Sequence, residues 1–319
     1  MRLTIVLVLL GLLPGLSGAF ECPQKAPPGA PEEKAEDCPW AGAARLMGAA
    51  DRAESAAVVL SSYAPGILRQ LDADRASRAE LKLWGRSINF DELANGEIVN
   101  PAVLGFIAAR AGVPPPKGRI MHAGVEHTYG YLFSLLPTKF GFKRARWVRP
   151  DIEDGLGLPR GLLGPEPAEG TLLANITCLA GGIVLKDDHA AMALLKSAAA
   201  GCGAPAKAYI SRKTARTRLA ETVTLPGGRK VVLRTDFVPF AKEAGGNTHL
   251  LIYSVYDSAL KQAYLVTAFP VNAAFVQSVL DPGGLGPRKP VQTRYNAFVE
   301  GLTGAGELAG SRRVLQLEK

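Results

Sequence analysis

The chain has little of the residue types that most often carry enzyme chemistry, with only four histidines and four cysteines among 319 residues. It has no GxSxG motif, no Walker loop and no GxGxxG segment ahead of a helical pattern. These absences argue against the common serine-hydrolase, phosphate-loop and dinucleotide-binding signatures. No cysteine pair has CxxC-like spacing, which disfavours zinc. We therefore predict no cofactor and no metal.

Long apolar runs are missing beyond the start of the chain. Residues 3–13 are apolar and follow Arg2, and the small residues Ser17, Gly18 and Ala19 come next. This pattern is typical of a signal peptide cut after Ala19. The run is too short to cross a bilayer core of about 30 Å as a helix. The sequence predicts a secreted or periplasmic protein without a transmembrane segment in the mature chain.

Acidic residues are outnumbered, with 29 Asp and Glu against 37 Lys and Arg. Removing the leader takes away only Arg2, which leaves 36 basic side chains against 29 acidic ones. A basic excess is typical of proteins that bind an anionic polymer, such as nucleic acid, an acidic glycan or a membrane surface. It is equally typical of a well-solvated exported protein, so both interpretations stay open.

All four cysteines, Cys22, Cys38, Cys178 and Cys202, follow the leader. An even count in an oxidising compartment predicts disulfides, with three possible pairings. We favour Cys22–Cys38 and Cys178–Cys202, because each bond closes a short loop and contributes about 3 kcal/mol.

Periodicity and turn residues predict an α+β protein with a largely antiparallel sheet and an N-terminal helical region packed on it. Residues 20–39 form a Pro/Glu-rich arm, residues 40–116 the helical region, and residues 117–319 a β-rich remainder in one compact domain with it. The clearest helix is 100–112, with a capping Asn100 and a terminal Gly112.

Several further elements are predicted from local patterns. Helices are expected at residues 187–200, 272–280 and 294–302. Hairpins are expected where glycine-containing turns divide β-forming runs. These hairpins cover residues 171–186, 222–234 and 249–269.

Residues 120–149 form the segment around which we expect the fold to be built. Their aromatic and threonine content favours extended structure and predicts two paired strands with a polar turn at residues 137–139. One face of the first strand would carry His127, Tyr129 and Tyr131.

The same segment supplies the first candidate catalytic residues, His122, Glu126 and His127. Two imidazoles and a carboxylate suit acid–base chemistry. Their HxxxEH spacing differs from the HExxH and HxxEH zinc motifs, so a metal would need help from Asp188, His189 or His249. Hydrogen-bonded structural histidines are the third possibility.

Basic residues supply the candidate binding site. Residues 143–149 contribute Lys143, Arg144, Arg146, Trp147 and Arg149, which follow Lys139. A second basic group is Lys207, Arg212, Lys213, Arg216, Arg218, Arg229, Lys230 and Arg234. On a sheet, alternate residues would form a cationic face on which aromatics stack bases or sugars. The alternative is a solvated face whose long side chains cover apolar surface.

A third candidate is His249, which precedes Tyr253, Tyr256 and the strand YLVTAFP. This arrangement resembles the core hairpins of secreted ribonucleases of the barnase and EndoU type over about 20 residues. The resemblance implies a His, a Lys or Arg, and a Ser or Thr around a scissile phosphate. Only His249 and Thr267 match, and the second histidine of the EndoU type has no counterpart.

Two functions are compatible with these patterns. The first is an exported, soluble binding or envelope-associated protein whose basic sheet face docks an acidic partner such as an anionic polymer. The alternative is a secreted hydrolase of a glycan, ester or RNA phosphodiester that uses His122, Glu126 and His127 with Arg144 and Arg146. The first is favoured, because no catalytic signature is complete.

Overall fold

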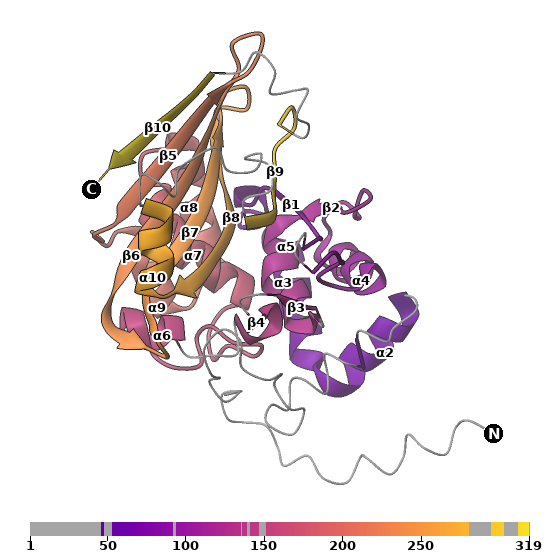
Figure 1. Cartoon of the computed structure of the whole chain (residues 1–319). Helices are drawn as coiled ribbons and strands as arrows, with labels where there is room; N and C mark the ends of the chain where they lie inside the picture. Colours follow the sequence, from indigo (N-terminus) through magenta and orange to yellow (C-terminus); the bar gives the residue numbers. More distant parts are fainter. Residues whose placement is uncertain are drawn as a thin grey trace, which may run out of the picture.

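The computed structural model describes residues 46–47, 53–91, 94–134, 136–138, 141–146, 151–280, 295–302 and 312–318. Within these ranges the protein is α+β with antiparallel sheets, as predicted (Figure 1). No helix in this part of the chain is long and apolar enough to cross a bilayer. The proposed leader, the Pro/Glu-rich arm, Cys22 and Cys38 lie outside the described residues.

The main sheet has five antiparallel strands in the order β10-β5-β6-β7-β8. The strands are β5 (Thr217–Thr224), β6 (Lys230–Ala244), β7 (Asn247–Asp257), β8 (Gln262–Val271) and β10 (Arg312–Glu318). The β5–β6 turn uses Gly227 and Gly228 at φ of 88° and 84°, which only glycine adopts readily. The hairpins expected at 222–234 and 249–269 are confirmed, with β7 inside the sheet and β8 at its edge.

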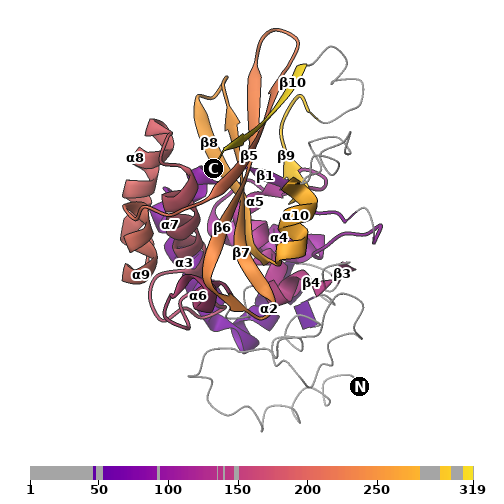
Figure 2. The same cartoon turned by 60° about the vertical axis from the view of Figure 1, so that its left-hand side comes forward.

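Helices lie on both faces of this sheet (Figure 2). One face is covered by α7 (Leu172–Val184), α8 (His189–Ala198) and α9 (Ala204–Lys207), and the other by α10 (Ala273–Leu280). The predicted helices at 187–200 and 272–280 are confirmed by α8 and α10. Their caps are side chains of Asp188 and Asn272, which accept from the amides of Ala191 and Phe275 at 2.8 Å each.

The N-terminal helices contact one another on the β8 side of the sheet (Figure 1). They are α2 (Ala53–Tyr63), α3 (Pro65–Ser77) and α4 (Pro101–Ala111). Helix α4 confirms the clearest prediction, because Asn100 Oδ1 accepts from the amide of Ala102 at 2.9 Å and Gly112 ends the helix at φ 72°. Helix α3 begins at Pro65, two residues after α2 ends at Tyr63.

Two short sheets accompany these helices. One has the order β2-β1-β9, and the other pairs β3 with β4. Their strands are β1 (Arg86–Ile88), β2 (Ile120–His122), β9 (Ala297–Phe298), β3 (Pro137–Thr138) and β4 (Gly141–Phe142). The helix expected at 294–302 is therefore wrong, because β9 pairs with β1 there.

The hairpin expected at 171–186 is also wrong, because α7 runs through it without interruption. All its residues are buried, so the sequence lacks the polar stripe that marks a surface helix. Gly182 serves packing here, since a Cβ atom would lie 2.4 Å from the carbonyl oxygen of Tyr209. The predicted Cys178–Cys202 disulfide is confirmed and ties α7 to the chain after α8.

The pair of strands expected at 120–149 is wrong as well. After β2 the chain forms the helix α5 (Ala123–Thr128), the 3-10 helix η4 (Gly130–Phe133), the short antiparallel β3–β4 pair and the 3-10 helix η5 (Lys143–Arg146). Residues 123–134 are all buried, so no alternation of inner and outer faces exists to support a surface strand. Gly124 lets α5 approach the ring of Trp84, because a Cβ atom would lie 2.6 Å from its Cγ.

Candidate functional site

The first candidate residue, His122, caps helix α5. Its Nδ1 accepts from the amide of Val125 at 3.3 Å, and its Nε2 lies 2.7 Å from the carbonyl oxygen of Leu81. The first contact requires an unprotonated Nδ1, so Nε2–H donates to Leu81. Burial lowers the pKa of His122 to about 4. His122 is therefore a neutral structural residue at physiological pH.

The other histidine candidates face different neighbours. His127 Nδ1 lies 2.6 Å from the carbonyl oxygen of Val266, while Glu126 accepts from the hydroxyl of Ser87. His249 lies on β7, and burial lowers its pKa. His122 and His127 thus contact different backbone carbonyl oxygens, and His249 lies on another element. Within the described ranges, no group of three His, Cys, Asp or Glu residues could hold a metal ion.

His127 and Lys143 both contact the buried side chain of Tyr131. The rings of His127 and Tyr131 have centroids 4.6 Å apart, and Lys143 Nζ lies 3.3 Å from the Tyr131 hydroxyl. Asn296 Nδ2 donates to the same hydroxyl at 3.4 Å. We call His127, Tyr131 and Lys143 the histidine–tyrosine cluster.

The next basic residue of this segment, Arg144, contacts the backbone. Arg144 is buried and donates through Nη1 to the carbonyl oxygen of Ser134 at 3.0 Å. The backbone of Arg146 belongs to η5, and Trp147 and Arg149 lie outside the described residues. Of the predicted binding residues around Lys143, Lys143 and Arg144 make contacts within the protein, and the side chains of the others lie outside what the structure describes.

The second basic group builds a more ordered arrangement on the main sheet. Register pairs Arg218 of β5 with Asp236 of β6, and Ala220 with Arg234. Because side chains alternate along a strand, Arg218, Arg234 and Asp236 share one face. This face is turned towards the C-terminal end of α7.

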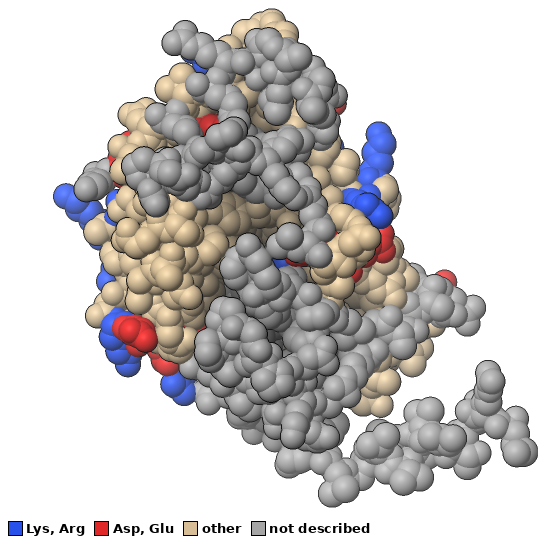
Figure 3. Space-filling model, viewed as in Figure 1, with Lys and Arg blue, Asp and Glu red and all other residues tan. Residues whose placement is uncertain are grey.

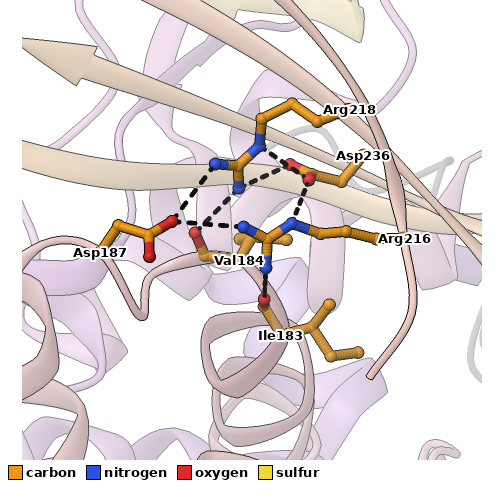
Figure 4. Close-up of polar contacts among 6 residues, drawn as sticks. All are labelled: Ile183, Val184, Asp187, Arg216, Arg218 and Asp236. Atoms are coloured by element: carbon orange, nitrogen blue, oxygen red, sulfur yellow. Dashed lines mark hydrogen bonds and ion pairs between the residues drawn. The ribbon is translucent and has the colours of Figure 1, made fainter. Parts of the chain in front are cut away.

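Two guanidinium groups converge on one buried carboxylate at this position (Figure 4). The Nε atoms of Arg216 and Arg218 lie 3.0 Å and 2.9 Å from Asp236 Oδ1. Arg216 Nη1 donates to the carbonyl oxygen of Ile183 at 2.5 Å, and Arg218 Nη2 donates to that of Val184 at 3.1 Å. Both arginines therefore cap the last turn of α7, where the helix dipole favours cations.

The outer nitrogens of the pair face Asp187, on the turn between α7 and α8. Its Oδ2 atom lies 3.3 Å from Arg216 Nη2 and 3.6 Å from Arg218 Nη1 (Figure 4). The Asp187 side chain is 66% exposed, whereas that of Asp236 is fully buried. We call Arg216 Nη2 and Arg218 Nη1, with the guanidinium groups that carry them, the arginine fork.

Two further cations, Lys186 and Arg234, lie close to the arginines of the fork. Burial raises the pKa of Asp236, and the guanidinium of Arg218 opposes that rise. Burial and then Arg218 lower the pKa of Arg234. Burial and then Arg216 lower the pKa of Lys186, which Asp187 raises again. Each of these cations would be stabilised by additional negative charge nearby.

Other members of the second basic group have separate contacts. Arg229 forms an ion pair with Asp257, and the guanidinium of Arg212 lies 4.7 Å from the ring centroid of Tyr209. Lys207, Lys213 and Lys230 are exposed. On the face in Figure 3, the described basic side chains are spread around the outline and interspersed with acidic ones. The fork is a local site where β5 and β6 face the C-terminal end of α7.

The sequence reasoning missed Asp187 and Asp236 as partners of the basic residues. The alternation Arg234-x-Asp236 on β6 was a usable signal, since both residues must lie on one face of that strand. It also missed that Lys143 reaches Tyr131, for which no local pattern gives a sign.

Comparisons with protein-family models, curated proteins and solved structures found no match. The function is therefore inferred from the fork and the cluster themselves.

Proposed function

We propose that this chain is an exported binding or envelope-associated protein that docks an acidic partner through the arginine fork. The observation that supports the proposal most is the position of the two guanidinium groups, fixed side by side by buried Asp236. Guanidinium groups suit carboxylate and phosphate oxygens, which they bind in pairs. A site fixed in advance loses less side-chain entropy on binding than flexible surface lysines would.

Export is part of the proposal. The Cys178–Cys202 disulfide is compatible with an oxidising compartment, and the leader pattern of residues 1–19 predicts secretion or transfer to a periplasm. The acidic partner would then be an anionic polymer of that compartment, because the chain retains a basic excess after the leader is removed.

The test is binding of polyphosphate, an anionic polymer, to the full exported chain and to the variant Arg216→Gln. The substitution removes one charge-assisted contact, so we expect affinity to fall roughly tenfold. The control Arg110→Gln removes the same charge from α4, where Arg110 forms an exposed ion pair with Asp72. That control should change affinity less than twofold, and wild-type affinity should fall steeply with salt. Equal losses in both variants would contradict docking at the fork.

A second candidate function, hydrolysis, is favoured by the convergence of His127, Tyr131 and Lys143. With Nδ1–H donated to Val266, Nε2 is the basic nitrogen of the His127 ring. It would take a proton from water as the hydroxide attacks an ester or phosphodiester, and return it to the leaving oxygen. Lys143 would hold the substrate's negative charge.

This second function predicts turnover of chromogenic ester, phosphodiester or glycoside substrates by the wild-type chain. His127→Gln should abolish that turnover, whereas His189→Gln, at the start of α8, should leave it unchanged. Absence of turnover with all three substrate types would remove the hypothesis.

A further inference from the structure

We infer that Asp187 is an internal competitor whose carboxylate occupies the arginine fork until a phosphate group of the partner displaces it. The inference rests on the proposed docking function and names the chemical group that the fork binds.

The fork offers more donors than Asp187 uses. One nitrogen of each guanidinium is directed outward, and both meet the same oxygen, Oδ2 of Asp187, at 3.3 Å and 3.6 Å. Charge-assisted contacts of this kind are usually about 2.7–2.9 Å long. A phosphate group presents several oxygens, so it can give one to Arg216 and another to Arg218. The contacts of the Asp187 carboxylate with the fork are therefore longer than usual.

Asp187 is also free to leave. Its side chain is 66% exposed, and ion pairs in such a position contribute little. The neighbouring Asp188 stabilises this turn, because it caps α8 and accepts from the amide of Ala263 at 3.0 Å. Displacement of Asp187 therefore leaves the helix start and the contact to β8 in place.

The surroundings favour a group with more negative charge than a carboxylate. Lys186 and Arg234 lie near Arg216 and Arg218, and their pKa values are lowered first by burial and then by the charge of Arg216 on Lys186 and of Arg218 on Arg234. The carboxylates of Asp236, Asp187 and Asp188 raise the pKa of Arg234 in turn, so negative charge at this place stabilises the cations. A phosphate dianion adds more charge at the fork than the Asp187 carboxylate that it replaces.

The experiment is a titration of the full chain with inorganic phosphate, followed by amide chemical shifts or calorimetry. Asp187→Asn removes the competitor and should tighten phosphate binding by about two- to fivefold, the range that corresponds to an exposed ion pair. The control Glu243→Gln removes an equal charge from an exposed position on β6 and should change affinity less. Adding Arg216→Gln to Asp187→Asn should cancel the gain.

Three results would overturn the inference: unchanged phosphate affinity in Asp187→Asn, equal tightening in Glu243→Gln, or acetate binding as tightly as phosphate. Asp187→Ser provides a second neutral variant should the Asn variant fold poorly by circular dichroism. The docking proposal fails separately, when Arg216→Gln leaves polyphosphate binding intact. If phosphate affinity still responds to Asp187 in that case, the fork binds phosphate but does not dock the polymer.

Discussion

Replacing Asp74 with Asn should make the protein more stable at neutral and alkaline pH. Asp74 lies on α3 with only 1% of its surface exposed. It accepts from the hydroxyl of Tyr129 at 2.6 Å and from that of Thr171 at 2.5 Å. An Asn side chain of the same shape can keep both contacts, because each hydroxyl can also accept a hydrogen bond.

The magnitude follows from the ionisation of Asp74. Burial raises its pKa from 3.8 to about 7, with a further contribution from Glu80, against the two hydrogen bonds that lower it. A difference of about 3 pKa units corresponds to roughly 4 kcal/mol. Between pH 4 and 7 the folded state holds a proton that the unfolded state has lost. The free energy of unfolding should therefore fall as pH rises through this window, and stay low above it.

The assay is urea-induced unfolding of wild type and Asp74→Asn at several pH values from 4.5 to 8. The difference in unfolding free energy should grow in favour of the variant, by up to about 4 kcal/mol. Asp72→Asn is the control, because Asp72 is an exposed carboxylate on the same helix, paired with Arg110. A difference between wild type and Asp74→Asn that stays constant with pH would refute the reasoning.

Further predictions concern stability, measured as the free energy of unfolding. His122→Ala should lower the free energy of unfolding by about 1 kcal/mol, because the cap of α5 is lost, and His122→Asn should lower it less. Because burial lowers the pKa of His122, its contribution to the free energy of unfolding should weaken as pH falls from 6.5 towards 4. Replacing Cys178 and Cys202 with alanine should cost about 3 kcal/mol, checked against the wild type under reducing conditions. Gly105→Ala should stabilise α4 by about 0.5–1 kcal/mol, because nothing lies within 4 Å of the new Cβ, whereas Gly182→Ala should destabilise α7 by clashing with backbone.

Local signals predicted those elements whose ends are marked by their own residues. Helix α4 has Asn100 before it and Gly112 after it, and the β5–β6 hairpin has its glycines at the turn. These residues act on backbone within a few positions, so their effect is readable without the fold. The same holds for the cap that Asp188 gives to α8.

The same local signals did not predict the buried segments. Helix α7 and residues 123–134 are enclosed on all sides, so neither shows the polar–apolar alternation that separates helix from strand. Their glycines looked like turn signals, but Gly124 and Gly182 permit close packing against Trp84 and Tyr209. Which role a glycine plays depends on a neighbour distant in sequence.

The sequence indicated which types of residue the candidate site contains, but not which of them contact one another. Arg216 and Arg218 belong to the predicted basic group, whereas their partner Asp236 is set by strand register and Asp187 by the end of α7. The histidines show the converse: His122 and His127 are close in sequence, yet their rings contact carbonyl oxygens far apart in the chain, those of Leu81 and Val266. Sequence spacing fixes where a backbone passes, not where its side chains turn.

The fork also bears on why the chain buries charges at all. Taking Arg218 and Asp236 out of water has a large desolvation cost, and an apolar pair of similar size would often be as stable. The cap of α7 accounts for the position of one guanidinium nitrogen of each arginine, and the contact with Asp236 accounts for that of another. Neither explains why Arg216 and Arg218 both direct a further nitrogen to one exposed point. In the proposed docking function, two fixed guanidinium groups presented to an incoming anion would account for that nitrogen, and Asp236 would be a positioning residue for binding.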